Sequence, residues 1–142
     1  MEIKPYRRKA NYYETDQMGI IHHSNYIRWF EEARIDFMEQ MGYSYRRMEE
    51  EGVASPVLAI SCNYKAMVRF GDEVIIKVSV SEFTGVKMII KYEVTDAKTD
   101  KVVTEGESKH CFTLKNGRPV SLLKYNKELY ELFELSMGGF GV

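Results

Sequence analysis

A short polar stretch near the start of the chain holds the residues whose types and spacing could do chemistry. Asp16 is followed by Gly19, and two histidines, His22 and His23, come directly before a helical pattern. A carboxylate can act as a general base or as a nucleophile. Free main-chain N–H groups at the start of a helix can stabilise an oxygen that gains negative charge. Together these groups predict attack on a carbonyl carbon, although Asp16 could instead only cap N–H groups of its own turn.

The element that must position this stretch is a long helix. Ser24 and Asn25 are good N-cap residues, and Gly42 supplies the left-handed conformation that ends a helix. Between them, apolar residues recur at three- and four-residue steps: Tyr26, Trp29, Phe30, Ala33, Phe37 and Met41. Three further apolar residues lie off this stripe: Ile27, Ile35 and Met38. We therefore expect a central, mostly buried helix, in which Trp29 and Phe30 belong to the core.

Alternating apolar and polar residues indicate strands in the rest of the chain. Residues 3–13 are expected to be extended, and Pro5 suits the beginning of an edge strand because it has no N–H to leave unpaired. Four longer alternating segments follow, each joined to the next by a short turn: residues 55–68, 74–80, 86–94 and 102–114. These segments predict an antiparallel meander in sequence order, which makes five strands with the N-terminal one.

Shorter elements complete the predicted fold. Residues 43–52 indicate a short helix or an irregular connection that closes at Gly52, and residues 119–135 indicate a C-terminal helix. Residues 137–142 contain three glycines and are expected to form a loose end.

Both faces of the predicted sheet carry apolar residues. Four of them alternate against the set that should face the helix: Ile75, Phe83, Ile89 and Val103. One helix covers only one side of a sheet, so a second layer is needed, and another copy of the chain is the simplest one. We therefore expect a homodimer or a homotetramer.

Composition limits the class of protein. With 142 residues, the chain is expected to form one domain over residues 1–142. The formal net charge of -1 provides no global field for nucleic acid or a membrane surface, and no apolar run is long enough to span a bilayer. Cys62 and Cys111 lack CxxC spacing, which suggests reduced thiols, and the N-terminus does not resemble a signal peptide. We expect a cytoplasmic protein without nucleic-acid or membrane partners.

The element order resembles the hotdog fold, an α+β fold in which a five-stranded antiparallel sheet is wrapped around a long central helix. The pattern Asp16-x-x-Gly19, followed by His23, Asn25 and Tyr26 and then an aromatic-rich helix, resembles the acyl-CoA thioesterases of the 4-hydroxybenzoyl-CoA thioesterase family. The resemblance covers nearly the whole chain. It implies hydrolysis of a thioester of coenzyme A or of acyl carrier protein, in an active site at a subunit interface, and we expect no cofactor.

The functional residues of that family match positions of this chain. The resemblance implies that Asp16 is the base or nucleophile, that the main-chain N–H of His23 binds the thioester oxygen, and that Tyr12 belongs to the site. We expect four residues to bind substrate: Gly19, Asn25, Tyr26 and Arg69. The chain departs from the family at residues 17–18, where small residues or proline are commoner, and at His22, which is often aromatic in relatives. These differences bear on the shape of the acyl pocket.

The leaving group bears on the role of His23. An alkyl thiol has a pKa near about 8.5, so its thiolate departs without a proton donor. We therefore expect the His23 side chain to orient Asp16, the water or the substrate, and not to act as an obligatory general acid. Asp16 could attack the carbonyl carbon directly, with a mixed anhydride as intermediate, or through a water molecule.

Several other residues have alternative interpretations. Asn25 could serve only as a cap, and Lys65, Arg69 and Arg118 could bind the phosphates of coenzyme A or only face solvent. Adjacent side chains diverge in most backbone conformations, and no third ligand lies at a useful spacing, so we expect no metal at the two histidines. His110, in an alternating strand pattern, is expected to be structural.

Two other functions remain open from the sequence. One is a hotdog hydratase or dehydratase of 3-hydroxyacyl thioesters, which would need a base near the α-carbon. Here the acid lies before a helix whose N-terminus suits a carbonyl oxygen, which favours hydrolysis. The other is a non-catalytic acyl-thioester binding protein. Release of free thiol from acyl-CoAs, together with analysis of the acyl chain, separates the three.

Overall fold

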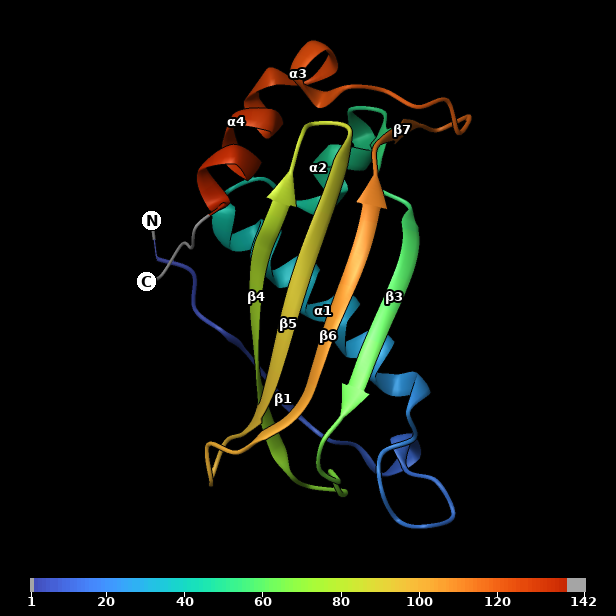
Figure 1. Cartoon of the computed structure of the whole chain (residues 1–142), viewed down its shortest axis with the longest axis vertical. Helices are drawn as coiled ribbons and strands as arrows, with labels where there is room; N and C mark the ends of the chain where they lie inside the picture. Colours follow the sequence, from blue (N-terminus) through green and yellow to red (C-terminus); the bar gives the residue numbers. More distant parts are fainter. Residues whose placement is uncertain (1, 138–142) are drawn as a thin grey trace.

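The computed structural model describes residues 2–137 and shows one curved sheet with a long helix against it (Figure 1). The helix, α1, spans Ser24–Met41. The sheet has five strands: β1 (Tyr6–Lys9), β3 (Val57–Tyr64), β4 (Glu73–Phe83), β5 (Lys87–Asp96) and β6 (Val102–Cys111). They lie in the order β1-β4-β5-β6-β3, and every neighbouring pair is antiparallel. The predicted α+β arrangement, with the N-terminal strand at an edge, is therefore confirmed.

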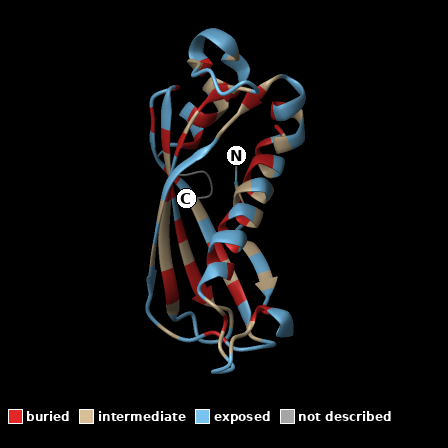
Figure 2. Cartoon of the chain, turned by 90° about the vertical axis from the view of Figure 1, so that its right-hand side faces the viewer, coloured by how far each residue is buried: buried red, intermediate tan, exposed pale blue. Residues whose placement is uncertain are grey.

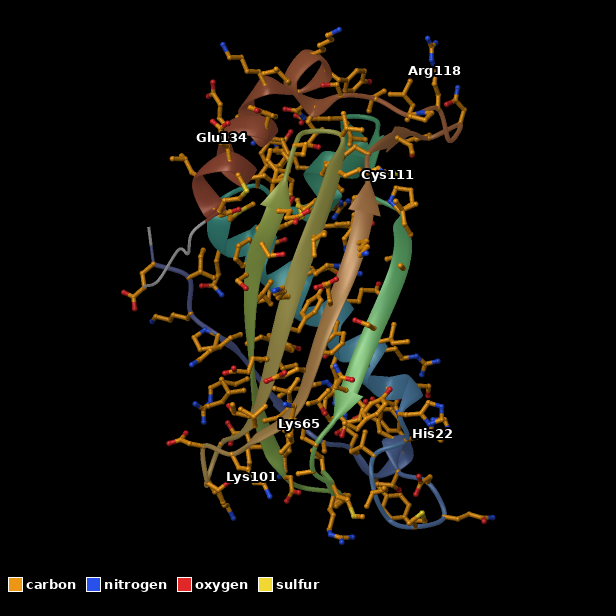
Figure 3. The ribbon with its side chains drawn as sticks, in the orientation of Figure 1. His22, Lys65, Lys101, Cys111, Arg118 and Glu134 are labelled. Atoms are coloured by element: carbon orange, nitrogen blue, oxygen red, sulfur yellow. The ribbon has the colours of Figure 1, made fainter. Side chains whose placement is uncertain are left out.

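Shorter elements lie at the two ends of the sheet. The 3₁₀ turn η1 (Tyr12–Glu14) lies at one end, near His22, and the remaining elements lie at the other end, near Arg118 (Figures 1 and 3). These are α2 (Tyr45–Glu50), the paired strands β2 (Val53–Ala54) and β7 (Thr113–Leu114), α3 (Leu122–Tyr125) and α4 (Lys127–Ser136).

The predictions for the shorter elements are confirmed in part. A short helix does precede Gly52, and the C-terminal segment is helical but is interrupted at Asn126, whose side chain caps α4. Met137 is not loose, because it forms a bridge with Val80. The rest of the predicted loose end, residues 138–142, lies outside the described residues.

The apolar stripe of α1 packs on the sheet as predicted, and all six of its residues are buried. The Phe30 ring stacks on Tyr92 of β5, with the ring centroids 4.3 Å apart. It also lies directly against Gly106 of β6, where a Cβ atom would overlap the ring. Ile27 and Ile35 are 44% and 36% exposed, so the opposite face of α1 is open and the helix is less buried than we expected (Figure 2).

The predicted meander in sequence order is wrong for β3. Only β4, β5 and β6 follow one another as hairpins, whereas β3 pairs with β6 at the far edge of the sheet. Residues 65–72 therefore cross the end of the sheet. At the start of this segment, the Val103 carbonyl accepts hydrogen bonds from the N–H groups of Lys65 and Ala66. The physical reason is that β1 and β5 occupy both edges of β4. A short polar turn in the sequence does not reveal such competition.

Two β-bulges also reverse the predicted facing of two residues. A register shift between Val80 and Glu82 turns Phe83 toward the core, where its ring packs against Phe112. Val103 is the extra residue of a second bulge, between β5 and β6, and it is buried. A bulge inserts one residue into the period of two, so every position after it faces the opposite side.

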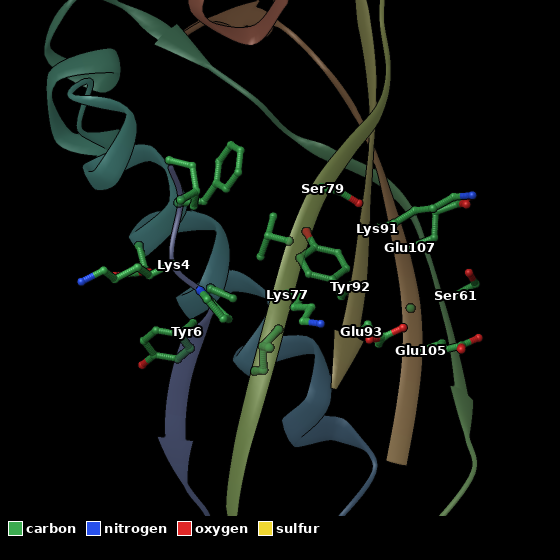
Figure 4. A pocket seen from close by; sticks show the side chains of 18 of the residues that line it. Lys4, Tyr6, Ser61, Lys77, Ser79, Lys91, Tyr92, Glu93, Glu105 and Glu107 are labelled. Carbon is green, nitrogen blue, oxygen red and sulfur yellow. The ribbon is translucent and has the colours of Figure 1, made fainter. Parts of the chain in front are cut away.

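The face of the sheet away from α1 is mostly polar. Of the four apolar residues predicted for this face, only Ile75 and Ile89 lie on it, and both are half-buried. The side chains of Lys91 and Glu107 point away from α1, whereas Tyr92 points toward it (Figure 4). A cavity of about 650 Å³ is lined by residues of both faces of this part of the sheet and by Ala33 and Phe37 of α1, but not by Asp16, His23 or Tyr12. Because this face is mostly polar, it provides only a weak reason to expect a partner chain.

A chain of hydrogen bonds crosses the interior between α1 and the sheet. The Arg34 side chain donates to Tyr92 Oη (3.0 Å), which lies 2.7 Å from Ser108 Oγ. Ser108 Oγ lies 2.7 Å from His110 Nε2, and His110 Nδ1 lies 3.2 Å from the Ser55 carbonyl. Because that carbonyl can only accept, Nδ1 carries the proton and Nε2 accepts from Ser108. His110 is thus buried, neutral and hydrogen-bonded at both ring nitrogens, as expected of a structural residue.

This arrangement lowers the pKa of His110. Burial disfavours the charged imidazolium; the hydrogen bond to Ser55 favours it, and the nearby Arg34 guanidinium disfavours it. A second proton on the ring would also reverse the bond to Ser108. Either the Tyr92 or the Ser108 hydroxyl would then have no acceptor within this series of hydrogen bonds.

We expect the free energy of unfolding to fall as the pH drops below about 6.5, because unfolded His110 binds a proton there and folded His110 does not. The contribution of neutral His110 to the free energy of unfolding is complete above the ordinary histidine pKa. It is lost as the pH falls toward the lowered pKa of His110 in the folded chain. His110→Gln removes this titration, while its amide can still donate to Ser55 and accept from Ser108. In urea unfolding at about pH 8 and about pH 5, the native chain should lose more stability than the variant. Equal losses would contradict this.

Candidate active site

Asp16 and Gly19 close a tight hairpin between η1 and α1. Thr15 and Ile21 pair as an antiparallel bridge, and the Asp16 N–H donates to the Ile20 carbonyl (2.8 Å). The Gly19 N–H donates to the Asp16 carbonyl (3.0 Å). Gly19 has φ of 76°, a left-handed conformation that residues with a Cβ atom rarely adopt. The spacing of the acid and the glycine therefore defines the turn, and the turn determines where the Asp16 carboxylate lies.

One oxygen of the Asp16 carboxylate is used within this turn. Oδ1 accepts the Met18 N–H at 2.8 Å, so the capping role considered from the sequence is present. Oδ2 accepts no hydrogen bond from residues 2–137, and the side chain is partly exposed. The turn thus orients the carboxylate through one oxygen and leaves the other available for chemistry.

The crossing segment, residues 65–72, holds the hairpin in place. Ile20 forms a bridge with Arg69, and the Ile21 N–H donates to the Val68 carbonyl (2.8 Å). The connection from β3 to β4, which the sequence did not reveal, is therefore what brings Arg69 beside the motif.

We had expected Ser24 or Asn25 at the N-cap position of α1, but His23 lies there, and its side chain makes no capping hydrogen bond. The Ser24 N–H donates to His22 Nδ1 (3.2 Å), and the Asn25 N–H donates to the His22 carbonyl (3.0 Å). The His23 N–H has no acceptor among residues 2–137. It is therefore a free donor at the positive end of the helix dipole.

Asn25 links the helix to the hairpin. Its side chain is 7% exposed, and its Nδ2 donates to the Glu14 carbonyl at 2.9 Å. The same carbonyl accepts the His22 N–H at 2.8 Å. The Asn25 side chain is therefore used within the fold, because the hairpin lies directly over it.

The Glu14 carboxylate, which is 3% exposed, is surrounded by donors. Oε1 accepts from Arg8 (2.5 Å) and from the Asn11 N–H (3.0 Å), and Oε2 accepts from Trp29 Nε1 (2.8 Å). Burial raises the pKa of Glu14, but these hydrogen bonds outweigh it and hold the pKa below its ordinary value. We did not identify Glu14 from the sequence. The signal for it was the Asn11-x-x-Glu14 spacing of a capping box, which the structure contains.

Exposed aromatic side chains surround this end of the molecule. Tyr12 is 76% exposed, and its ring meets Phe70 edge-on at a centroid distance of 5.6 Å. Tyr64 of β3 is 51% exposed, and its hydroxyl donates to the His23 carbonyl at 3.4 Å. Tyr26, in contrast, is buried in the core. Tyr64 and Phe70 were missed from the sequence because only the position of β3 and the crossing segment bring them to the motif.

The three basic residues considered for phosphate binding have different surroundings. Arg69 is exposed beside the hairpin, and its guanidinium has no carboxylate partner in the described part of the chain. Lys65 pairs with Glu105 at 3.4 Å. Arg118 lies at the opposite end of the molecule from His22 (Figure 3). Within one copy of the chain, Arg69 and Arg118 are therefore not neighbours.

The two histidine side chains lie together, contrary to our expectation that they diverge. The rings of His22 and His23 stack with centroids 4.2 Å apart. Even so, residues 2–137 contain no group of three or more His, Cys, Asp and Glu side chains that could hold a metal ion. His22 Nδ1 also lies 2.8 Å from Ser24 Oγ, so this ring serves the helix start.

Known proteins resemble this chain in sequence and in structure. Residues 11–130 match the model of the Thioesterase-like superfamily. A protein of Aquifex aeolicus is 38% identical over 119 residues, which are 84% of this chain and 91% of the relative. The acyl-CoA thioester hydrolase YbgC of Escherichia coli O157:H7 is 26% identical over 90 residues, 63% of this chain and 67% of the relative. Among solved structures, the DHNA-CoA thioesterase of Staphylococcus aureus is 32% identical with a TM-score of 0.89, covering 95% of this chain and 91% of that one.

The chain therefore belongs to the thioesterase-like superfamily, and its fold is the hotdog fold that the motif and the element order had indicated. The predicted class of enzyme, a thioester hydrolase, is confirmed at the level of this family. No helix within residues 2–137 is both long enough and apolar enough to cross a membrane.

Proposed function

We propose that this protein hydrolyses acyl-CoA thioesters to the free acid and coenzyme A where the Asp16 hairpin meets the start of α1. The observation that carries the proposal is the His23 N–H, which opens the helix and has no acceptor among residues 2–137. A donor of this kind stabilises the negative charge that develops on a thioester oxygen. Removing such a donor typically costs about 10²- to 10³-fold in rate. The reactions named for the relatives support the same chemistry.

Asp16 acts on the carbonyl carbon. In one route its free oxygen, Oδ2, bonds to the carbon, the C–S bond breaks and the thiolate leaves, after which water hydrolyses the mixed anhydride. In the other route Asp16 takes a proton from a water molecule while that water attacks the carbon, and the thiolate leaves as the intermediate collapses. Both routes end in the same acid and thiol. The thiolate needs no proton donor, so the His23 side chain serves orientation.

The substrate lies across the exposed residues at this end of the molecule. Tyr12, Tyr64 and Phe70 provide apolar surface for the acyl group beside the Gly19 turn. Arg69 binds a phosphate of coenzyme A, since its exposed guanidinium has no carboxylate partner in the described residues. A thioester of acyl carrier protein presents the same reacting group, so it belongs among the substrates to be tested.

The proposed enzyme is a single domain over residues 1–142 that acts as a homodimer or homotetramer in the cytoplasm. β3 lies at an edge of the sheet, so its outer N–H and C=O groups can pair with another strand. Val57, Leu58 and Tyr64 expose apolar surface along this strand, and a second copy paired there would cover it. Cys62 and Cys111 are free thiols, which suits a reducing compartment.

A panel of thioesters tests the proposal. Short-chain, medium-chain, long-chain and aromatic acyl-CoAs and an acyl-acyl carrier protein are incubated with the protein. Free thiol is followed with a thiol reagent, and the acyl product is identified by mass spectrometry. Release of thiol together with the free acid supports hydrolysis. A changed acyl chain without thiol would indicate a hydratase, binding without either change would indicate a carrier, and both results would overturn the proposal.

Asp16→Asn should lower kcat by about 10²- to 10⁴-fold, because the carboxylate acts in the transition state as base or nucleophile. KM should stay within about threefold of the native value, as expected for a group that contributes little to ground-state binding. Asp100→Asn, in the exposed turn between β5 and β6, is the matched control and should retain activity. A raised KM with kcat preserved would instead assign Asp16 to substrate recognition.

His23→Ala should lower kcat less than Asp16→Ala does. The donor to the thioester oxygen is the main-chain N–H at position 23, which alanine keeps. Both variants are compared on the best substrate of the panel, with circular dichroism to establish that they are folded. If two folded variants were equally inactive, the ranking of the two side chains would be wrong.

A further inference from the structure

We propose that Glu14 is a positioning residue of this site: its buried carboxylate holds in place the carbonyl group that, in turn, orients the His23 N–H. This inference rests on the proposed function, because it assigns a catalytic consequence to the direction of that N–H. Glu14 itself is 3% exposed, so it acts through other residues and does not touch the substrate.

A single oxygen atom anchors the chain on both sides of His23. The Glu14 carbonyl accepts the His22 N–H at 2.8 Å and the Asn25 side-chain amide at 2.9 Å. The peptide that carries the His23 N–H therefore lies between two anchors that share one acceptor. A shift of this oxygen moves both anchors together and turns the donor away from the thioester oxygen. Misplacement of a reacting group by about 1 Å can cost about 10²-fold in rate.

The carboxylate of Glu14 fixes that oxygen through three elements of the fold. It accepts from Arg8 of β1, from the Asn11 N–H that opens η1, and from Trp29 of α1. The Arg8 guanidinium lies 4.9 Å from the centre of the Trp29 ring, and its Nε also donates to Glu32 at 2.6 Å on the solvent side. The edge strand, the hairpin and the helix are thus joined at one buried side chain.

Only an ionised glutamate satisfies all of these partners. Every group that faces its two oxygens is a donor, namely Arg8, the Asn11 N–H and Trp29. A glutamine would have to turn its own NH₂ group toward one of those donors. An aspartate is one methylene shorter and cannot span Arg8 and Trp29 together.

The central test is Glu14→Gln with Glu32→Gln as the matched control. Glu14→Gln should lower kcat about 10- to 100-fold with KM within about threefold of native, because the oxyanion donor is misdirected while the binding surface stays. Glu32→Gln removes a carboxylate from the same arginine, but Glu32 contacts neither the hairpin backbone nor Trp29. It should keep kcat within about twofold of native, because the Glu32 side chain lies on the outer side of Arg8, is 37% exposed, and a glutamine oxygen there can still accept from Arg8.

A rescue experiment separates positioning from general stability. Trp29→Phe in the Glu14→Gln background removes the indole N–H, so the glutamine NH₂ can face the vacated position while its oxygen still accepts from Arg8 and Asn11. The double variant should recover part of the lost kcat, although each single change lowers kcat. If kcat instead followed the free energy of unfolding across all variants, the role of Glu14 would be stability alone and the inference would fail.

Trp29 also supplies a spectroscopic readout, because it is the single tryptophan of the chain and its Nε1 donates to Glu14. Its fluorescence emission should shift in Glu14→Gln and stay unchanged in Glu32→Gln. If Glu14→Gln does not fold, Trp29→Phe alone decides: a lower kcat at native KM supports the inference, and native kcat overturns it.

The outcomes distinguish this inference from the proposed function. A folded Glu14→Gln variant with native kcat, alongside an inactive Asp16→Asn variant, would overturn the role of Glu14 and leave the thioesterase proposal standing. A native protein that releases no thiol from any member of the panel would overturn both.

Discussion

The Glu14 carbonyl accepts two hydrogen bonds, from the His22 N–H and from the Asn25 side chain, and these bonds join the hairpin of Asp16 to the start of α1. A helix begins with N–H groups that have no partner inside the helix, and a side-chain cap usually satisfies some of them. Here the His22 ring and carbonyl serve the Ser24 and Asn25 N–H groups. No cap accepts the His23 N–H, so the contacts that hold this segment leave free the donor that the proposed reaction needs.

The ion cluster beneath this carbonyl explains why the junction can be rigid. Burying a carboxylate is costly unless it is paired and hydrogen-bonded. The charge of Arg8 and its hydrogen bond to one oxygen of Glu14 offset the cost of burial, and the Trp29 indole N–H donates to the other oxygen. Elsewhere in the described residues, every buried side-chain nitrogen and oxygen also has a hydrogen-bond partner. The series of hydrogen bonds that links Arg34 to Ser55 through His110 is an example. The buried polar side chains of the described residues are therefore all hydrogen-bonded, whereas the main-chain N–H of His23 has no acceptor among residues 2–137.

Sheet connectivity determines what surrounds that donor. Because β3 pairs with β6 at the far edge, the chain must cross the end of the sheet to begin β4. The crossing brings Arg69 and Phe70 against the hairpin, and the end of β3 places Tyr64 over the His23 carbonyl. The same topology leaves the outer edge of β3 unpaired. The proposed site lining and the proposed surface for a second copy thus follow from one feature of the fold.

The sequence by itself determined the elements that depend on neighbours along the chain. α1 runs to Gly42, whose φ is 85°, with its predicted stripe buried, because a period of 3.6 and a left-handed stop are local properties. The turn from Asp16 to Gly19 was likewise predictable, since a glycine at positive φ closes it. The family was indicated by the resemblance of this motif and of the element order to the 4-hydroxybenzoyl-CoA thioesterase family.

Only the tertiary structure decided which strand lies beside β3, which way Phe83 and Val103 face, and that Asn25 links the helix to the hairpin. It also revealed Glu14, whose partners come from β1, η1 and α1. Strand order, bulges and burial depend on competition among residues far apart in the sequence. A periodic pattern records which face of an element is apolar, but it does not record which element will cover that face.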